Sequence, residues 1–239
     1  MSLAAVGVLA WMGWHSSRQQ QNSANGALTN TSALNSATNK DDAAMFRAWL
    51  STNVDATELL GVGTKLLEEG RPDAAILCYR RAHELKPTDE EACFNLGVAH
   101  ARLGQAADAE RYYREALKLF PDYVEAHINL GNLLTRQKRY DEALTEFNAA
   151  LKLSPEDASA HNNLGRVLAQ RGEPVEAVKH FAEAARLDTN YVEARFNLGT
   201  AHLTLGQTND AIAAFQEVLR LRPNFGPAMQ ALARLKTSP

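Results

Sequence analysis

The stretch NLGVAHARLGQAADAERYYREALKLFPDYVEAHINLG, residues 95–131, begins and ends with the tripeptide Asn-Leu-Gly. Its two outer glycines, Gly97 and Gly131, are 34 residues apart, and the same interval leads back to Gly63 and on to Gly165 and Gly199. In four of these five places the glycine ends an Asn-Leu-Gly tripeptide. Self-similarity at a fixed period of this length is typical of a repeat array.

The period divides most of the chain into five consecutive units. With Ala56 as position 1, the units are residues 56–89, 90–123, 124–157, 158–191 and 192–225. Mostly apolar or small residues at positions 3, 7, 8 and 11 mark one side of a first helix, and those at positions 20, 24 and 27 mark one side of a second. Each unit is therefore predicted to be a helical hairpin.

Small and aromatic residues recur at fixed positions of the units. Position 8 is always glycine, position 20 is always alanine, and position 24 is always Tyr or Phe. Two helices approach most closely where small side chains separate them. We expect positions 8, 20 and 27 to form that close contact, with the aromatic residue and the Leu of position 7 filling the space beside it.

Helix ends also repeat. A glycine occupies position 15 in four units, where a left-handed C-cap would end the first helix, and a proline at position 32 stops the second in four units. Capping boxes that begin at Asp55, Thr88, Asp122 and Asn190 are expected to start the next helix. Residues 226–239 are expected to form a C-terminal helix that covers the last unit.

These columns resemble the tetratricopeptide repeat family, and the resemblance covers residues 56–225. It implies an all-α fold, a right-handed α-solenoid of five hairpins with a C-terminal capping helix, in which the first helices line a concave groove. The sequence departs from the family pattern at His100 and His202, where the family prefers Tyr or Leu, and at Val218, which replaces an alanine.

Position 6 carries four identical amides that we expect to face the groove. They are Asn95, Asn129, Asn163 and Asn197. A side-chain amide has donors and an acceptor, so it can pair with the backbone of an extended peptide. Neighbouring positions supply apolar and basic side chains, which are Phe94, Ile128, Phe196, Arg102, Arg136 and Arg166. The alternative is that Asn at position 6 is a frequent residue of the family on surfaces without a ligand.

Composition and motifs argue against several other functions. The 239 residues include 25 Lys and Arg against 28 Asp and Glu, a net charge of -3, which does not favour nucleic-acid binding. Cys78 and Cys93 are too few for a zinc site, and their pairing stays open. No two of the seven histidines lie three or four residues apart, so His127 and His161 are interpreted as packing residues. We expect no catalytic residue, no metal and no cofactor, and the chain is predicted not to be an enzyme.

The first 55 residues differ from the repeats. Residues 3–14 are uncharged and apolar, but they are fewer than the roughly 20 that span a bilayer, and no basic residue precedes them. They are read as a membrane anchor, an export signal or a disordered start, so the chain is membrane-associated, exported or cytoplasmic. Residues 1–40 thus combine this segment with a polar linker, and residues 41–55 are predicted to form a short capping helix.

The leading hypothesis is a non-catalytic protein–protein interaction scaffold that binds an extended peptide in its groove and is held at a membrane by its N-terminus. An accessory subunit of an enzyme or assembly complex is the alternative. An RNA-binding helical repeat is disfavoured by the strict 34-residue period and the net charge.

Overall fold

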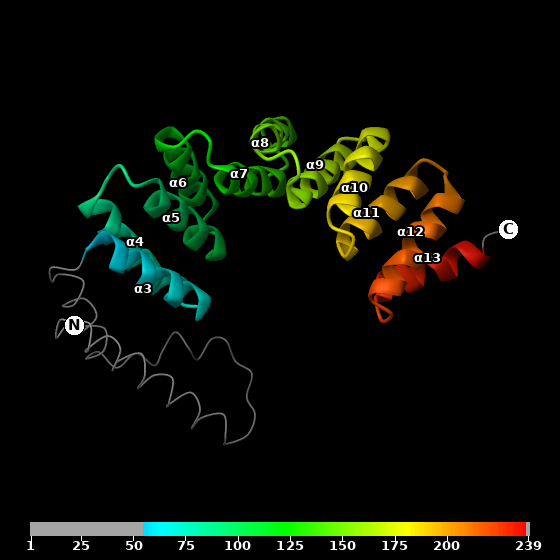
Figure 1. The fold of residues 1–239 in the computed structure, drawn as a ribbon, viewed down its shortest axis with the longest axis horizontal. Helices are drawn as coiled ribbons and strands as arrows, with labels where there is room; N and C mark the ends of the chain where they lie inside the picture. The colour runs from blue at the N-terminus through cyan, green and yellow to red at the C-terminus, as the bar shows by residue number, and fades with distance from the viewer. Residues whose placement is uncertain (1–54, 238–239) are drawn as a thin grey trace, which may run out of the picture. The chain divides into compact units, whose positions relative to one another are not determined.

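The computed structural model describes residues 55–237, so the predictions for residues 1–40 and, apart from Asp55, for residues 41–55 lie outside that range. The described residues form eleven helices and no strand, which confirms the all-α prediction. They fall into two compact units, with the division between Pro87 and Thr88. The helices of both are labelled in Figure 1.

The first unit contains one hairpin, α3 (Ala56–Glu68) and α4 (Pro72–Leu85). The second contains four hairpins and a final helix. Its helices are α5 (Glu90–Arg102), α6 (Ala106–Leu119), α7 (Val124–Arg136), α8 (Tyr140–Leu153), α9 (Ala158–Gln170), α10 (Pro174–Leu187), α11 (Val192–Thr204), α12 (Thr208–Leu221) and α13 (Gly226–Thr237). We call the first helix of each hairpin helix A and the second helix B.

The recurring glycine of position 8 lies directly against the aromatic ring of position 24. A Cβ atom added to Gly97 would lie 2.5 Å from Cδ1 of Tyr113, and one added to Gly131 would lie 2.9 Å from Cε1 of Phe147. The sequence indicated a close contact here but placed the ring beside it. In the structure the ring itself occupies the space that a side chain at position 8 would need.

The helix A C-termini follow the prediction, with one addition. Gly70, Gly104, Gly172 and Gly206 all have positive φ angles, between 71° and 82°. In the third repeat Lys138 occupies the same place with φ 62°. A lysine thus adopts the left-handed conformation that its neighbouring repeats assign to glycine.

Three of the four predicted capping boxes begin at the wrong residue. Asp55 does cap α3, since its carboxylate accepts from the Glu58 amide at 2.7 Å. At α5 the cap is Asp89 rather than Thr88, and α7 and α11 follow Tyr123 and Tyr191 without a side-chain cap. The aromatic residue before α7 is used for packing, because Tyr123 lies 4.8 Å from Phe94 between ring centroids.

The final helix α13 packs against α12. Ala228 is fully buried in a cluster with Ala211, Phe215 and Val218, and Leu232 and Leu235 pack against the same cluster. The apolar side of the fifth hairpin is therefore covered.

Within the second unit the A helices lie closer to one another than the B helices do. α5 contacts α7, α7 contacts α9, and α9 contacts α11, whereas successive B helices have fewer contacts. A stack of hairpins that is tighter on one side bends toward that side. The A helices of the second unit therefore line its inner face.

Candidate functional site

Four asparagines lie at the same place on successive A helices of the second unit. Each side chain is half-buried, and the four residues are Asn95 on α5, Asn129 on α7, Asn163 on α9 and Asn197 on α11. Because the units repeat every 34 residues, each amide has the same place on its helix A. It immediately precedes the core Leu of position 7.

Two of these amides already have partners within the protein. The side-chain oxygen of Asn163 accepts a hydrogen bond from the Arg166 guanidinium at 3.1 Å. The Asn197 amide donates to the side-chain oxygen of Asn162 at 2.9 Å. The second half of the row is therefore partly satisfied by the protein itself.

Asn162 is a polar residue that the sequence-based reasoning did not single out. It is only 2% exposed, and its amide also donates to the Tyr191 hydroxyl at 3.3 Å. Buried amides need such partners, because an unsatisfied polar group costs free energy. The available signal was the column itself: position 5 holds Leu, Phe or Ile in the other units, and an isolated Asn there predicts a buried hydrogen bond.

The first two amides of the row differ from the last two. Among residues 55–237, no hydrogen bond to the side chain of Asn95 or Asn129 is present. Each of these amides can offer two donors and an acceptor to a ligand. α5 and α7 contact each other, so the two amides belong to neighbouring helices of the inner face.

The apolar residues of position 5 pack into the core and expose only part of their surface. Phe94 and Ile128 pack against the central core of the second unit, and Phe196 packs against the C-terminal cluster. Phe196 also contacts the Phe225 ring, with 5.3 Å between centroids. Their exposed edges offer apolar contact beside the amides.

Three basic side chains are exposed on the A helices of the second unit, Arg102, Arg136 and Arg166. Arg102 and Arg136 lie in the last turns of α5 and α7, where a positive charge is favoured by the helix dipole. Burial raises the pKa of Tyr113 to about 12, and the positive charge of Arg136 acts in the opposite direction. Arg102 follows Asn95, and Arg136 follows Asn129, by seven residues or two helical turns, so each arginine lies on the same side of its helix as the amide.

The histidines at position 4 pair with helix B rather than with each other. Nδ1 of His127 is 2.6 Å from a Glu146 carboxylate oxygen, and its Nε2 donates to the Pro121 carbonyl at 2.9 Å. His161 is hydrogen-bonded to His180, with 3.0 Å between the Nδ1 atoms. The hydrogen bond to Glu146 is the main cause that raises the pKa of His127. The bonds to Glu146 and His180 join the two helices of a hairpin.

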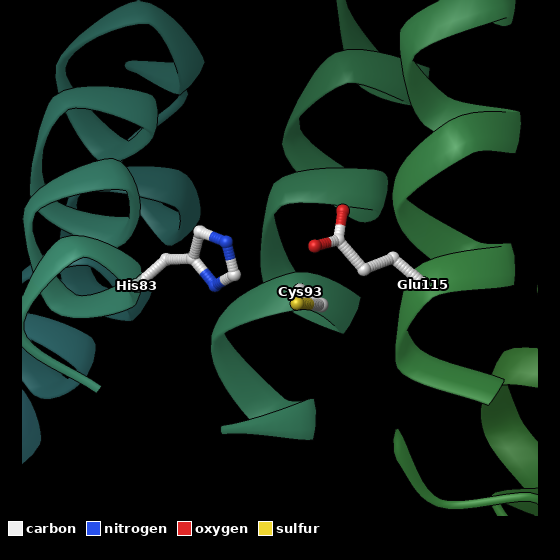
Figure 2. A group of neighbouring side chains, drawn as sticks. All are labelled: His83, Cys93 and Glu115. Carbon is white, nitrogen blue, oxygen red and sulfur yellow. The ribbon is translucent and has the colours of Figure 1, made fainter. Parts of the chain in front are cut away.

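Both cysteines are buried thiols that form no disulfide bond. Figure 2 shows Cys93 on α5 and Glu115 on α6, together with His83 of the first unit. Sγ of Cys93 and a Glu115 carboxylate oxygen lie within 4.8 Å of each other. Burial, followed by carboxylates that include Glu115, raises the pKa of the Cys93 thiol to about 12. The thiol is therefore protonated at neutral pH, which makes it a poor nucleophile.

Sequence profiles of the tetratricopeptide repeat match residues 63–104, 94–156, 129–192 and 168–235. The matched residues extend over well more than half of the chain, and they coincide with the hairpins described above. The chain belongs to the tetratricopeptide repeat family. A comparison with curated protein sequences found no match.

Several solved structures have the same fold. A structure of MamA from residue 41 to the end, from Desulfovibrio magneticus RS-1, is 23% identical, with 72% of this chain and 97% of the MamA chain aligned at a TM-score of 0.66. YrrB, described as a TPR protein with an unusual peptide-binding site, is 21% identical over 79% of this chain and 97% of YrrB, with a TM-score of 0.64. PilF of Pseudomonas aeruginosa is 24% identical over 75% of this chain and 82% of PilF, with a TM-score of 0.70.

At these identities the likeness shows the fold alone. The fold and the family together support a protein–protein interaction scaffold, and proteins of this family are typically non-catalytic and bind protein or peptide partners. Within residues 55–237, none of the helices has both the length and the apolar character needed to span a bilayer.

Proposed function

We propose that the inner face of the second unit binds an extended segment of a partner protein, with the side chains of Asn95 and Asn129 pairing with its backbone. The observation that carries this proposal is the row of position-6 amides, of which these two neighbours have no hydrogen bond within the described residues. Hydrogen bonds to a peptide backbone are independent of the peptide's side chains. Affinity would come from the amides, and selectivity from the groups around them.

The surroundings of the two amides support this proposal. The edges of Phe94 and Ile128 offer apolar contact, and the guanidinium groups of Arg102 and Arg136 can meet carboxylates. YrrB, which has the same fold, is described as having a peptide-binding site, so a fold of this kind accommodates a peptide. Asn163 and Asn197 are assigned a smaller part, because each already has a bond within the protein.

A binding measurement with a peptide selected on the full chain from a random library tests the proposal. Replacing both Asn95 and Asn129 by Ala removes two hydrogen-bonding groups and should weaken binding about ten-fold or more, as measured by fluorescence anisotropy. Asn148→Ala is the matched control, because Asn148 is an exposed amide on helix B of the third repeat. Equal affinity of the double variant and the parent, with unchanged helical content, would refute the groove assignment.

We further propose that residues 3–14 hold the chain at a membrane. This segment has no charged residue, and Trp11 and Trp14 near its end suit a membrane interface. Cell fractionation should place the full chain in the membrane fraction and a version that starts at Asp41 in the soluble fraction. The same distribution for both would contradict the tether.

A further inference from the structure

Three aromatic rings gather where α5 and α7 begin. The rings of Phe94, on α5, and Tyr123, the residue before α7, lie 4.8 Å apart between centroids. The Phe120 ring lies 5.9 Å from that of Tyr123, and 44% of Phe120 is exposed. The face of an aromatic ring attracts a cation.

The charges beside these rings are negative. Glu91 and Glu125 are exposed in the first turns of α5 and α7. Burial, followed by the carboxylates of Glu125, Glu91, Glu90 and Asp89, raises the pKa of Tyr123 to about 12. The rings and the carboxylates therefore favour a cation at the same place. We call Phe94, Phe120, Tyr123, Glu91 and Glu125 the aromatic–acidic cluster.

The same repeat position in the fifth unit already contains a cation of the chain. Phe196 and Phe225 correspond to Phe94 and Tyr123, and their centroids are 5.3 Å apart. The guanidinium carbon of Arg222 lies 5.7 Å from the centroid of Phe225. Arg222 stands at position 31 of its unit, where the second unit has Phe120, so the fifth unit presents a guanidinium group to Phe225 from the position at which Phe120 lies beside Tyr123.

The fourth unit offers a second comparison. Tyr191 corresponds to Tyr123, but Asn162 stands where Phe94 would be, and it donates to the Tyr191 hydroxyl. Burial is the main cause that raises the pKa of Tyr191, and the positive charge of Arg166 acts against it. The charged groups that shift the pKa of Tyr191 thus include a cation besides the carboxylates of Glu193 and Asp157, whereas all those that shift the pKa of Tyr123 are carboxylates.

We propose that the aromatic–acidic cluster binds the guanidinium group of an arginine side chain from the partner segment. The cation lies against the rings of Tyr123 and Phe120, and the carboxylates of Glu91 and Glu125 balance its charge. The location suits a segment that crosses the A helices, because Phe94 immediately precedes Asn95. The inference rests on the proposed function, because the arginine belongs to the partner segment that the A helices bind. The site itself can be tested without a peptide.

Nuclear magnetic resonance of the ¹⁵N-labelled full chain tests the site with small probes. Nα-acetyl-arginine methylamide should shift the backbone amide signals of Tyr123 and Glu125 in a saturable manner. The citrulline analogue has the same shape without the charge, so it should bind about five-fold more weakly or worse. Equal binding of the two probes, or no shift at these residues, would overturn the proposal.

Three variants separate this site from an effect on folding. Tyr123→Leu removes the ring and should abolish the preference for arginine, and Glu125→Gln should weaken arginine binding about two-fold or more while leaving an exposed position uncharged. Glu193→Gln is the matched control, since Glu193 follows Tyr191 as Glu125 follows Tyr123. Arginine binding that is unchanged in Glu125→Gln, or equally reduced in Glu193→Gln, would refute the assignment. A negative result with these probes would refute the arginine site alone. The proposed peptide binding is tested separately by the Asn95 and Asn129 substitutions.

Discussion

Replacing Gly97 by Ala tests the contact between glycine and aromatic ring that recurs in every hairpin. The added Cβ would lie 2.5 Å from Cδ1 and 2.6 Å from Cε1 of Tyr113. Carbon atoms in contact are about 3.5 to 4.0 Å apart, so the ring or the helix must move by about 1 Å. Tyr113 is 3% exposed and lies 6.0 Å from the Phe94 ring between centroids, which leaves the ring little room.

The expected change in unfolding free energy combines two opposing effects. Overpacking of a core costs about 1 to 3 kcal/mol, while Ala in place of Gly inside a helix gains about 1 kcal/mol. Gly97→Ala should therefore lose between about 0 and 2 kcal/mol of unfolding free energy. Gly61 is the matched control, because it lies inside α3 and an added Cβ meets nothing within 4 Å. Gly61→Ala should gain about 1 kcal/mol.

Urea unfolding followed by circular dichroism at the helix band measures both variants. The two substitutions are chemically identical, so a lower stability of Gly97→Ala than of Gly61→Ala, each relative to the parent, would trace the difference to the ring of Tyr113. A Gly97→Ala variant that is stabilised as much as Gly61→Ala would refute the argument.

Three further predictions concern the second unit. Lys138→Gly should raise the unfolding free energy by about 0.5 to 1 kcal/mol in urea titrations, because φ is 62° there and glycine adopts that conformation without strain; a loss of stability would contradict this. The pKa of His127 is raised mainly by its hydrogen bond to Glu146, so this contribution to stability is complete below the unfolded pKa of about 6.5 and is lost as pH rises through the folded pKa. An NMR titration should find the His127 pKa lower in Glu146→Gln than in the parent, and no change would exclude the bond as the cause. Asn162→Ala should cost about 1 to 3 kcal/mol in the same urea assay, because it leaves the Asn197 amide without its partner, and a neutral result would show that water replaces that bond.

The repeat period predicts the hairpins well because it combines several independent constraints at each position. Small residues, aromatic residues and helix-ending glycines all recur at the same interval, so the errors of any single position matter little. The exceptions are residues whose contacts differ from those of the residues at the same position in the other units. The N-cap of α7 was expected at Asp122, but the residue directly before α7 is Tyr123. Its side chain packs against Phe94 instead of capping the helix.

The candidate site could be predicted only in part. The row of amides follows from the period, since every position-6 residue has the same place on helix A. Which amides are already bonded depends on neighbours across repeats: Asn197 meets Asn162, which is 35 residues away and not in its own column. No periodic pattern contains that information, because a single polar substitution in one unit changes the environment of a residue in the next. Lys138 is the opposite case, since the residue type gives no signal of a left-handed backbone but the glycines at position 15 of the other four units do.

The hydrogen bond between Asn162 and Asn197 joins α9 to α11, and so it connects two successive repeats rather than two helices of one hairpin. In a linear array, bonds of this kind set how cooperatively neighbours unfold, whereas bonds inside a hairpin set the stability of that hairpin alone. The fifth hairpin and α13 are thereby tied to the rest of the unit through a partly buried polar contact. Without it, the C-terminal end would open as a separate step at lower denaturant, and amide hydrogen exchange would quicken there first.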